Sequence, residues 1–130
     1  MRVEAEAWWK EALESLRAAE HLLKAGFYNY AAFHSHQAAE KALKTLIIEK
    51  LRVSPPKTHN LLTLSEALKG VVDLGEVLDD LKDLNPHYLV SRYPDAANGV
   101  PSEVYSKRMA EACLSMARGV VEWAKRLLNA

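Results

Sequence analysis

Apolar side chains recur at intervals of three and four residues along most of the chain, and this spacing predicts α-helices. The first predicted helix has one apolar face, made of Trp9, Ala12, Leu13, Leu16, Ala19 and Leu23. Gly26 follows this face and is a natural C-terminal stop. A second, alanine-rich helix is predicted from about Asn29 to Leu51, since Pro55 and Pro56 beyond it forbid a helix.

Three more helices are predicted in the second half of the chain. The third is short, covers residues 60–70 and follows Thr58, which can cap it. The fourth runs from about Leu74 to Leu89, and the fifth follows Ser102 as its N-cap and buries a stripe that ends at Leu127. No segment reads as a credible strand. We therefore predict an all-α fold, a five-helix up-and-down bundle with mostly short, antiparallel connections, in a single domain of residues 1–130.

The stretch SRYPDAANGVPS, residues 91–102, has no helical period and is predicted to be a loop. Loops of this length in a compact domain are often functional. Tyr93 precedes Pro94, so its backbone is expected to be extended. Arg92 lies near the C-terminal end of the fourth helix, where a cation also complements the helix dipole. A purely structural alternative is a Tyr–Pro plug held by an Arg92–Asp95 pair.

The second helix contains FHSHQAAEKALKTL, residues 33–46, in which His-x-His suggests a metal site. His34 and His36 are about 200° apart around a helix, so they cannot bind one metal ion from a single helix. We therefore expect no metal there. His36 falls on the apolar face and is expected to be a core histidine, whereas His34, Gln37 and Lys41 form a polar stripe on the other side. This stripe is either a solvated helix face or part of a binding site.

Composition narrows the possible functions. The chain is 49% hydrophobic and 26% charged, as in ordinary globular proteins, and its 17 basic and 17 acidic residues give no net charge. A general positive field for nucleic acid is therefore missing, although residues 41–57 are locally basic.

The single cysteine, Cys113, excludes an intramolecular disulfide and a Cys-based zinc site and is expected to be buried. With no long apolar run and no signal-like segment, a soluble cytoplasmic protein is expected. No Gly-rich phosphate loop or nucleophile elbow occurs, and no cofactor is expected.

Three motifs in order, YAAFHSHQAAEKALKTLI, PPKTHNLLTL and YLVSRYPD…GVPSEVY, resemble the prokaryotic HEPN family. The resemblance covers about residues 5–128. It implies a five-helix up-and-down domain, commonly a homodimer, that binds nucleotide or RNA. It also implies a minimal nucleotidyltransferase as partner in a toxin–antitoxin-like pair. By matching motif, the implied binding residues are His34, Gln37, Lys41, His59, Arg92, Tyr93 and Asp95, with Lys41 and Arg92 on phosphate and Tyr93 stacking on a base.

Many HEPN domains are metal-independent endoribonucleases with an arginine followed by a histidine after four to six residues. Here no histidine follows Arg92, and the match from Arg52 to His59 spans the wrong loop and is interpreted as chance. A base such as His59 or His87 could instead be recruited in space or across a dimer. A binding role is favoured, and an RNA-cleaving toxin with a composite site at the dimer interface and a ligand-free helical adaptor are the alternatives. If the partner modifies this chain, Tyr88, Tyr93 or Tyr105 is the expected acceptor of AMP.

Overall fold

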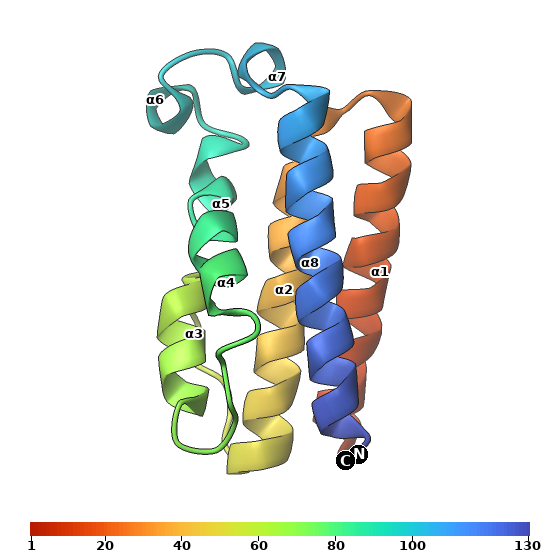
Figure 1. Ribbon diagram of the computed structural model, residues 1–130, viewed down its shortest axis with the longest axis vertical. Helices are drawn as coiled ribbons and strands as arrows, with labels where there is room; N and C mark the ends of the chain where they lie inside the picture. Colours follow the sequence, from red (N-terminus) through yellow and green to blue (C-terminus); the bar gives the residue numbers. More distant parts are fainter.

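The computed structural model describes residues 1–130 as a bundle of α-helices without strands (Figure 1). Three helices are long, namely α1 (Val3–Ala25), α2 (Tyr28–Leu51) and α8 (Lys107–Leu128). Five are short, namely α3 (Leu61–Leu68), α4 (Leu78–Leu84), α5 (His87–Val90), α6 (Pro94–Ala97) and α7 (Pro101–Val104). The predicted all-α fold is confirmed, and no helix is both long and apolar enough to cross a membrane.

Helix α2 is the central element of the bundle. It contacts α1 and α8 along its length and also α3, α4, α5 and α7. Its alanines, among them Ala31, Ala38 and Ala42, are fully buried and let neighbouring helices approach closely. Because neighbours surround α2, the predicted division into an apolar and a polar face is too simple: Thr45, four residues after Lys41 of the predicted polar stripe, is fully buried.

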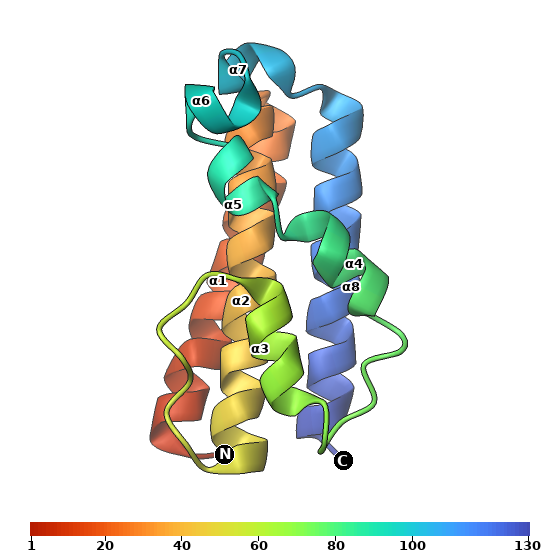
Figure 2. The same cartoon turned by 90° about the vertical axis from the view of Figure 1, so that its left-hand side faces the viewer.

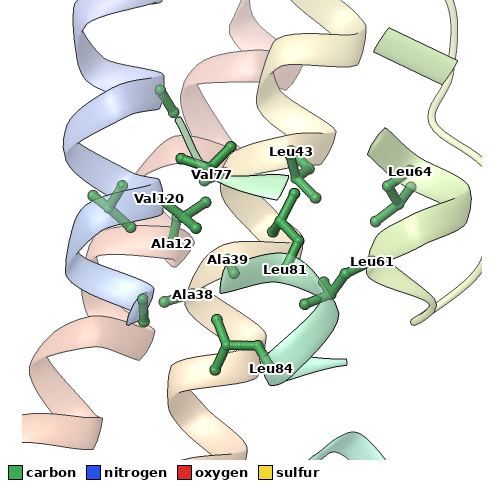
Figure 3. Close-up of a cluster of buried hydrophobic side chains, with 14 of the residues drawn as sticks. Ala12, Ala38, Ala39, Leu43, Leu61, Leu64, Val77, Leu81, Leu84 and Val120 are labelled. Atoms are coloured by element: carbon green, nitrogen blue, oxygen red, sulfur yellow. The ribbon is translucent and has the colours of Figure 1, made fainter. Parts of the chain in front are cut away.

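The core lies between α2, α8 and the short helices α3 and α4 (Figure 3). Leu43 of α2, Leu61 and Leu64 of α3, and Leu81 and Leu84 of α4 point into it. Leu68 of α3 is buried as well, so Leu61, Leu64 and Leu68 form one apolar face of this helix. In α1 the core face is made chiefly of alanines, and Leu13 was wrongly predicted to lie on it, because 44% of its surface is exposed.

The predicted fourth helix is broken into two. Residues 74–77 form a turn, α4 ends at Leu84, and α5 starts only after Pro86. Proline has no N–H to donate to the carbonyl four residues earlier, so a continuous helix cannot pass through it. Asn85 lies at this break, and its side-chain Oδ1 accepts a hydrogen bond from the backbone N–H of Leu61 at 2.8 Å. The break therefore fixes the start of α3 against α4.

Two helix starts also differ from the prediction. The last helix begins at Lys107, and its N-cap is Ser106 and not Ser102. The hydroxyl of Ser106 accepts a hydrogen bond from the N–H of Met109. Pro101 instead opens the separate helix α7, and the extended backbone of Tyr105 ends it. Helix α3 is capped by the side chain of Asn60 and not by Thr58.

The termini of the elements otherwise follow the sequence signals. Gly26 ends α1 with a φ of 86°, in the left-handed region that glycine tolerates. Tyr93 is extended, as its proline neighbour requires. The 52–60 segment turns back from the end of α2, so that α3 runs in the same direction as α2 and not antiparallel to it (Figure 2). This returning segment lies beside the start of α1 and ends just below α5 (Figure 2).

Candidate functional site

A buried carboxylate, Glu40 of α2, connects three polar side chains. Its Oε1 lies 2.9 Å from Nδ1 of His59 and accepts from the amide of Gln37 at 3.3 Å. Its Oε2 accepts from Nζ of Lys44 at 3.2 Å. Glu40 and Lys44 are themselves buried, whereas 51% of the His59 side chain is exposed. Glu40 thus holds a surface histidine of the 52–60 segment on the central helix.

Because an ionised carboxylate only accepts hydrogen bonds, its contact with His59 places the proton of the neutral imidazole on Nδ1. The other ring nitrogen, Nε2, then carries the free lone pair. A histidine in this tautomer can accept a proton or a hydrogen bond from a ligand on its exposed side.

His36 lies directly behind this pair and is fully buried, as predicted. Its Nδ1 is 3.4 Å from the amide nitrogen of Gln37 and 3.9 Å from Oε1 of Glu40, and its Nε2 has no hydrogen-bond partner. Burial lowers the pKa of His36 to about 3, and the nearby charges of His59, His87 and Arg92 act in the same direction. His36 is therefore neutral at physiological pH.

Tyr88 of α5 brings the 52–60 segment and the 91–102 region together. Its ring stacks on that of His59, with centroids 4.1 Å apart and planes 12° from parallel. Cζ of Arg92 lies 4.6 Å from the centroid of the same Tyr88 ring. A pocket of about 360 Å³ opens beside this pair and is lined by Thr58, His59, Asn60, Asn85, Pro86, Tyr88 and Leu89.

The guanidinium of Arg92 is held in a fixed place by aromatic rings. Cζ lies 4.3 Å from the ring centroid of Phe33 and 4.9 Å from that of Tyr93. Nε and Nη2 donate to the backbone carbonyl of Tyr88, at 3.1 and 2.8 Å. This contact with the last turn of a helix was the predicted structural role of Arg92. The remaining N–H groups of the guanidinium make no hydrogen bond within the chain.

The other predicted site residues lie at different distances from this cluster. Lys41 faces α1, where its Nζ donates to Oγ of Ser15 at 2.8 Å and lies 4.0 Å from Glu11. His34 is half-buried beside Phe33, and burial followed by the charge of Lys41 lowers its pKa. The predicted stripe of His34, Gln37 and Lys41 is thus divided, since only Gln37 reaches Glu40.

In the 91–102 region, Tyr93 is 46% exposed and lies against Arg92, whereas Asp95 is exposed in the first turn of α6. No Arg92–Asp95 pair forms, so the alternative of an ion pair holding the loop is wrong. The region itself contains the short helices α6 and α7, joined at Asn98 with a φ of 53°. Together His59, Arg92 and Tyr93 are the predicted residues that the fold gathers around Tyr88.

The remaining candidates of the sequence lie elsewhere. His87 turns away from the cluster, with Nδ1 2.5 Å from the hydroxyl of the buried Tyr105, and burial lowers the His87 pKa. Arg52 caps the end of α2 with a left-handed φ of 59° and does not line the pocket beside Tyr88. Cys113 is buried, and burial raises its pKa to about 12, so it is not a reactive thiol.

Glu40 and Lys44 were missed as site residues, and Tyr88 was named only as a possible acceptor of AMP. The signal for Glu40 was a carboxylate four residues after His36, which places it on the same inward side of an alanine-rich helix. A charge at such a position needs a partner, and Lys44 follows after four more residues. Tyr88 lies within the predicted fourth helix, and the break at Pro86 that turns it toward His59 was not predicted.

Comparison with known proteins identifies the family. The model of the HEPN domain matches residues 5–127. The chain belongs to the HEPN domain family. It is 31% identical to a protein of Methanocaldococcus jannaschii named "Putative toxin MJ1304", over 96% of this chain and 88% of that protein.

Three solved structures resemble the fold closely. TT1696 from Thermus thermophilus has a TM-score of 0.88 at 31% identity and covers 96% of this chain and 98% of its own. ST0689, described as an archaeal HEPN homologue, has a TM-score of 0.78 at 31% identity, with 98% of both chains covered. A HEPN domain protein of Thermotoga maritima, TM0613, has a TM-score of 0.76 at 26% identity and covers 95% of this chain and 98% of its own.

Proposed function

We propose that this HEPN protein binds nucleotide or RNA at the cluster of His59, Tyr88, Arg92 and Tyr93, which we call the Tyr88 cluster. The observation that carries the proposal is the Arg92 guanidinium, fixed among three aromatic rings and with N–H groups left over. Such a guanidinium is suited to a phosphate oxygen, and the exposed ring of Tyr93 is suited to stacking on a base. The half-exposed His59 offers a further hydrogen bond.

Binding of a dinucleotide such as adenylyl-adenosine, measured by calorimetry, tests this proposal. Arg92→Ala is expected to weaken binding by about tenfold or more, because a charge-assisted hydrogen bond contributes about 1.5–3 kcal/mol. Arg118→Ala is the matched control, since Arg118 is an exposed arginine of α8 that pairs with Glu20. Equal affinities for the wild type and Arg92→Ala would show that the Tyr88 cluster does not hold the ligand.

The resemblance to a protein named as a putative toxin supports a place in a toxin–antitoxin-like pair. We propose a minimal nucleotidyltransferase as the partner and a homodimer as the working form. Among the three candidate acceptors of AMP, Tyr105 is 3% exposed and its hydroxyl is engaged with His87, whereas Tyr93 is freely accessible. We therefore expect AMP on Tyr93.

Intact mass after co-expression with the neighbouring nucleotidyltransferase gene, where one exists, tests this assignment. A mass gain that is lost in Tyr93→Phe and kept in Tyr105→Phe is the expected result. A gain that persists in Tyr93→Phe would move the acceptor to another residue, and an unmodified mass beside an active transferase would argue against the modification.

A metal-independent endoribonuclease is the second candidate, because His59 and Arg92 both contact the ring of Tyr88. The two residues are far apart in sequence and in the reverse order of the family motif, yet both lie against the ring of Tyr88. His59, oriented by Glu40, would take the 2′-OH proton, and Arg92 would stabilise charge on the phosphate oxygens. A ligand-free adaptor is less favoured, since it would leave the remaining guanidinium N–H groups of Arg92 without a ligand to bind.

Cleavage of single-stranded RNA in the presence of EDTA tests this second candidate. Loss of cleavage in His59→Ala, with retained RNA binding, would assign His59 as the base. His87→Ala is the control, because His87 is turned toward Tyr105 and is expected to leave cleavage unchanged. Absence of cleavage with and without the partner protein would leave binding as the function.

A further inference from the structure

Two adjoining pockets lie between the 52–60 segment and the start of α1. One of about 410 Å³ is lined by Trp8, Lys44, Lys57, His59 and residues 54–56. The other, of about 300 Å³, includes Trp8, Arg2 and Arg52. Because Trp8, Ser54 and Pro55 line both pockets, the two adjoin, and we call them together the loop groove. Each falls in the size range of about 300–1,000 Å³ that is typical of ligand sites.

The loop groove leads into the Tyr88 cluster. His59 lines both the groove and the pocket beside Tyr88. Direct contacts connect the two ends: Nζ of Lys44 is 5.0 Å from the ring centroid of Trp8 and 3.2 Å from Glu40, which in turn holds His59. In Figure 2 the 52–60 segment follows this course, from the end of α2 beside α1 to just below α5. The path therefore has the rings of His59 and Tyr88 at one end and the ring of Trp8 where the two pockets adjoin.

The groove is basic although the chain as a whole has no net charge. Its charged lining consists of Arg2, Lys44, Arg52 and Lys57 against the single acid Glu4. Arg52 and Lys57 are exposed and take part in no ion pair, so their charges are free for an anionic ligand. Other lysines of the locally basic segment are engaged within the chain, as Lys50 is with the carbonyl of Leu127.

We propose that the loop groove extends the Tyr88 cluster into a track for single-stranded RNA, with Trp8 as a second stacking platform; this rests on the proposed function. A single strand exposes both a regular line of phosphates and the faces of its bases, so it matches free cations that lie beside partly exposed aromatic rings. Lys57 contacts a phosphate between Trp8 and the Tyr88 cluster, and Arg52 contacts one beyond Trp8. A mononucleotide would occupy only one end of this track.

Fluorescence anisotropy with two labelled probes, a dinucleotide and a decanucleotide of uridine, tests the length of the track. The wild type is expected to bind the decanucleotide more tightly. Trp8→Ala is expected to weaken decanucleotide binding by about 5- to 150-fold, which corresponds to the loss of one stacked base, and to leave dinucleotide binding unchanged. Trp8→Phe keeps a ring at the position and retains most of the affinity.

The cations are tested by the salt dependence of decanucleotide binding. The double variant Arg52→Ala, Lys57→Ala is expected to reduce the slope of log K against log salt by about 1.4, because each phosphate contact to a single strand contributes about 0.7. Lys24→Ala, Lys82→Ala removes the same charge from exposed positions outside the groove and is expected to keep the slope.

The outcomes separate the groove from the Tyr88 cluster. If the decanucleotide binds no more tightly than the dinucleotide, the groove is not a track and the cluster alone holds the ligand. If only the decanucleotide binds and depends on Trp8 but not on Arg92, the groove stands and the proposed cluster is overturned. Binding of neither probe overturns both.

Discussion

The buried, neutral His36 makes the stability of this protein depend on pH in a specific way. Its pKa is about 3 in the folded chain and about 6.5 in an unfolded one, so between these values the unfolded chain binds more protons. Stability must therefore fall as the pH falls below about 6.5. From pH 7 to pH 5 the loss due to His36 alone is about 2 kcal/mol, and by pH 3 it reaches about 4 kcal/mol.

The substitution that isolates this contribution is His36→Leu, which fills a similar volume, does not titrate and removes a buried nitrogen without a partner. Urea unfolding of the wild type and the variant at pH 7 and pH 5 gives four free energies of unfolding. We expect the wild type to lose about 2 kcal/mol more than the variant between the two values. Burial also lowers the pKa of His34 and His87, but both remain in the variant and cancel in the comparison.

His21→Leu serves as the matched control, since His21 is an exposed histidine of α1. Its replacement is expected to leave the pH dependence of the free energy of unfolding unchanged. Equal losses in the wild type and in His36→Leu would contradict this account of His36. That result would mean that His36 becomes charged in the folded state at ordinary acidity, with Glu40 as its partner.

Three further predictions concern stability and are checked by urea or thermal unfolding at pH 7. Glu40→Ala leaves a buried lysine without a partner and is expected to cost about 3 kcal/mol, whereas Glu66→Ala, which breaks an exposed pair, is expected to cost less than about 1 kcal/mol. Ser106→Ala removes an N-cap and is expected to cost about 1 kcal/mol, and Ser102→Ala almost nothing; the reverse order would place the start of α8 at Ser102. Gly26→Ala puts a side chain at a φ of 86° and is expected to cost about 1 kcal/mol; an unchanged stability would show that the turn relaxes freely.

The long helices could be predicted from the sequence because apolar periodicity and terminal signals agreed there. Helix α2 lies within a residue of its predicted bounds, and Gly26 ends α1 as expected. The helix bounds that were predicted wrongly lie where two local sequence signals point to different structures. Pro86 lay inside an otherwise good apolar stripe, and two serines were available as caps for α8. The capping geometry that chooses between them depends on the path of α7, which the sequence pattern does not show.

The candidate site was less predictable than the fold. His59, Arg92 and Tyr93 were singled out from motifs, but what joins them is Tyr88, whose orientation depends on the kink before α5. The two sides of α2 were distinguished by periodicity alone, which could not tell that Lys41 faces α1. Long-range contacts of this kind leave no periodic trace in the sequence.

The central position of α2 has a consequence for how proteins of this shape can diverge. Glu40 and Lys44 belong at once to the core and to the candidate site, so changing either one alone leaves a buried charge uncompensated. Arg52 and Lys57, by contrast, lie exposed on a connecting segment, so replacing either one leaves no buried charge without a partner. Among related sequences, Glu40 and Lys44 are therefore expected to be replaced together or not at all, and ligand preference is expected to drift through the 52–60 segment.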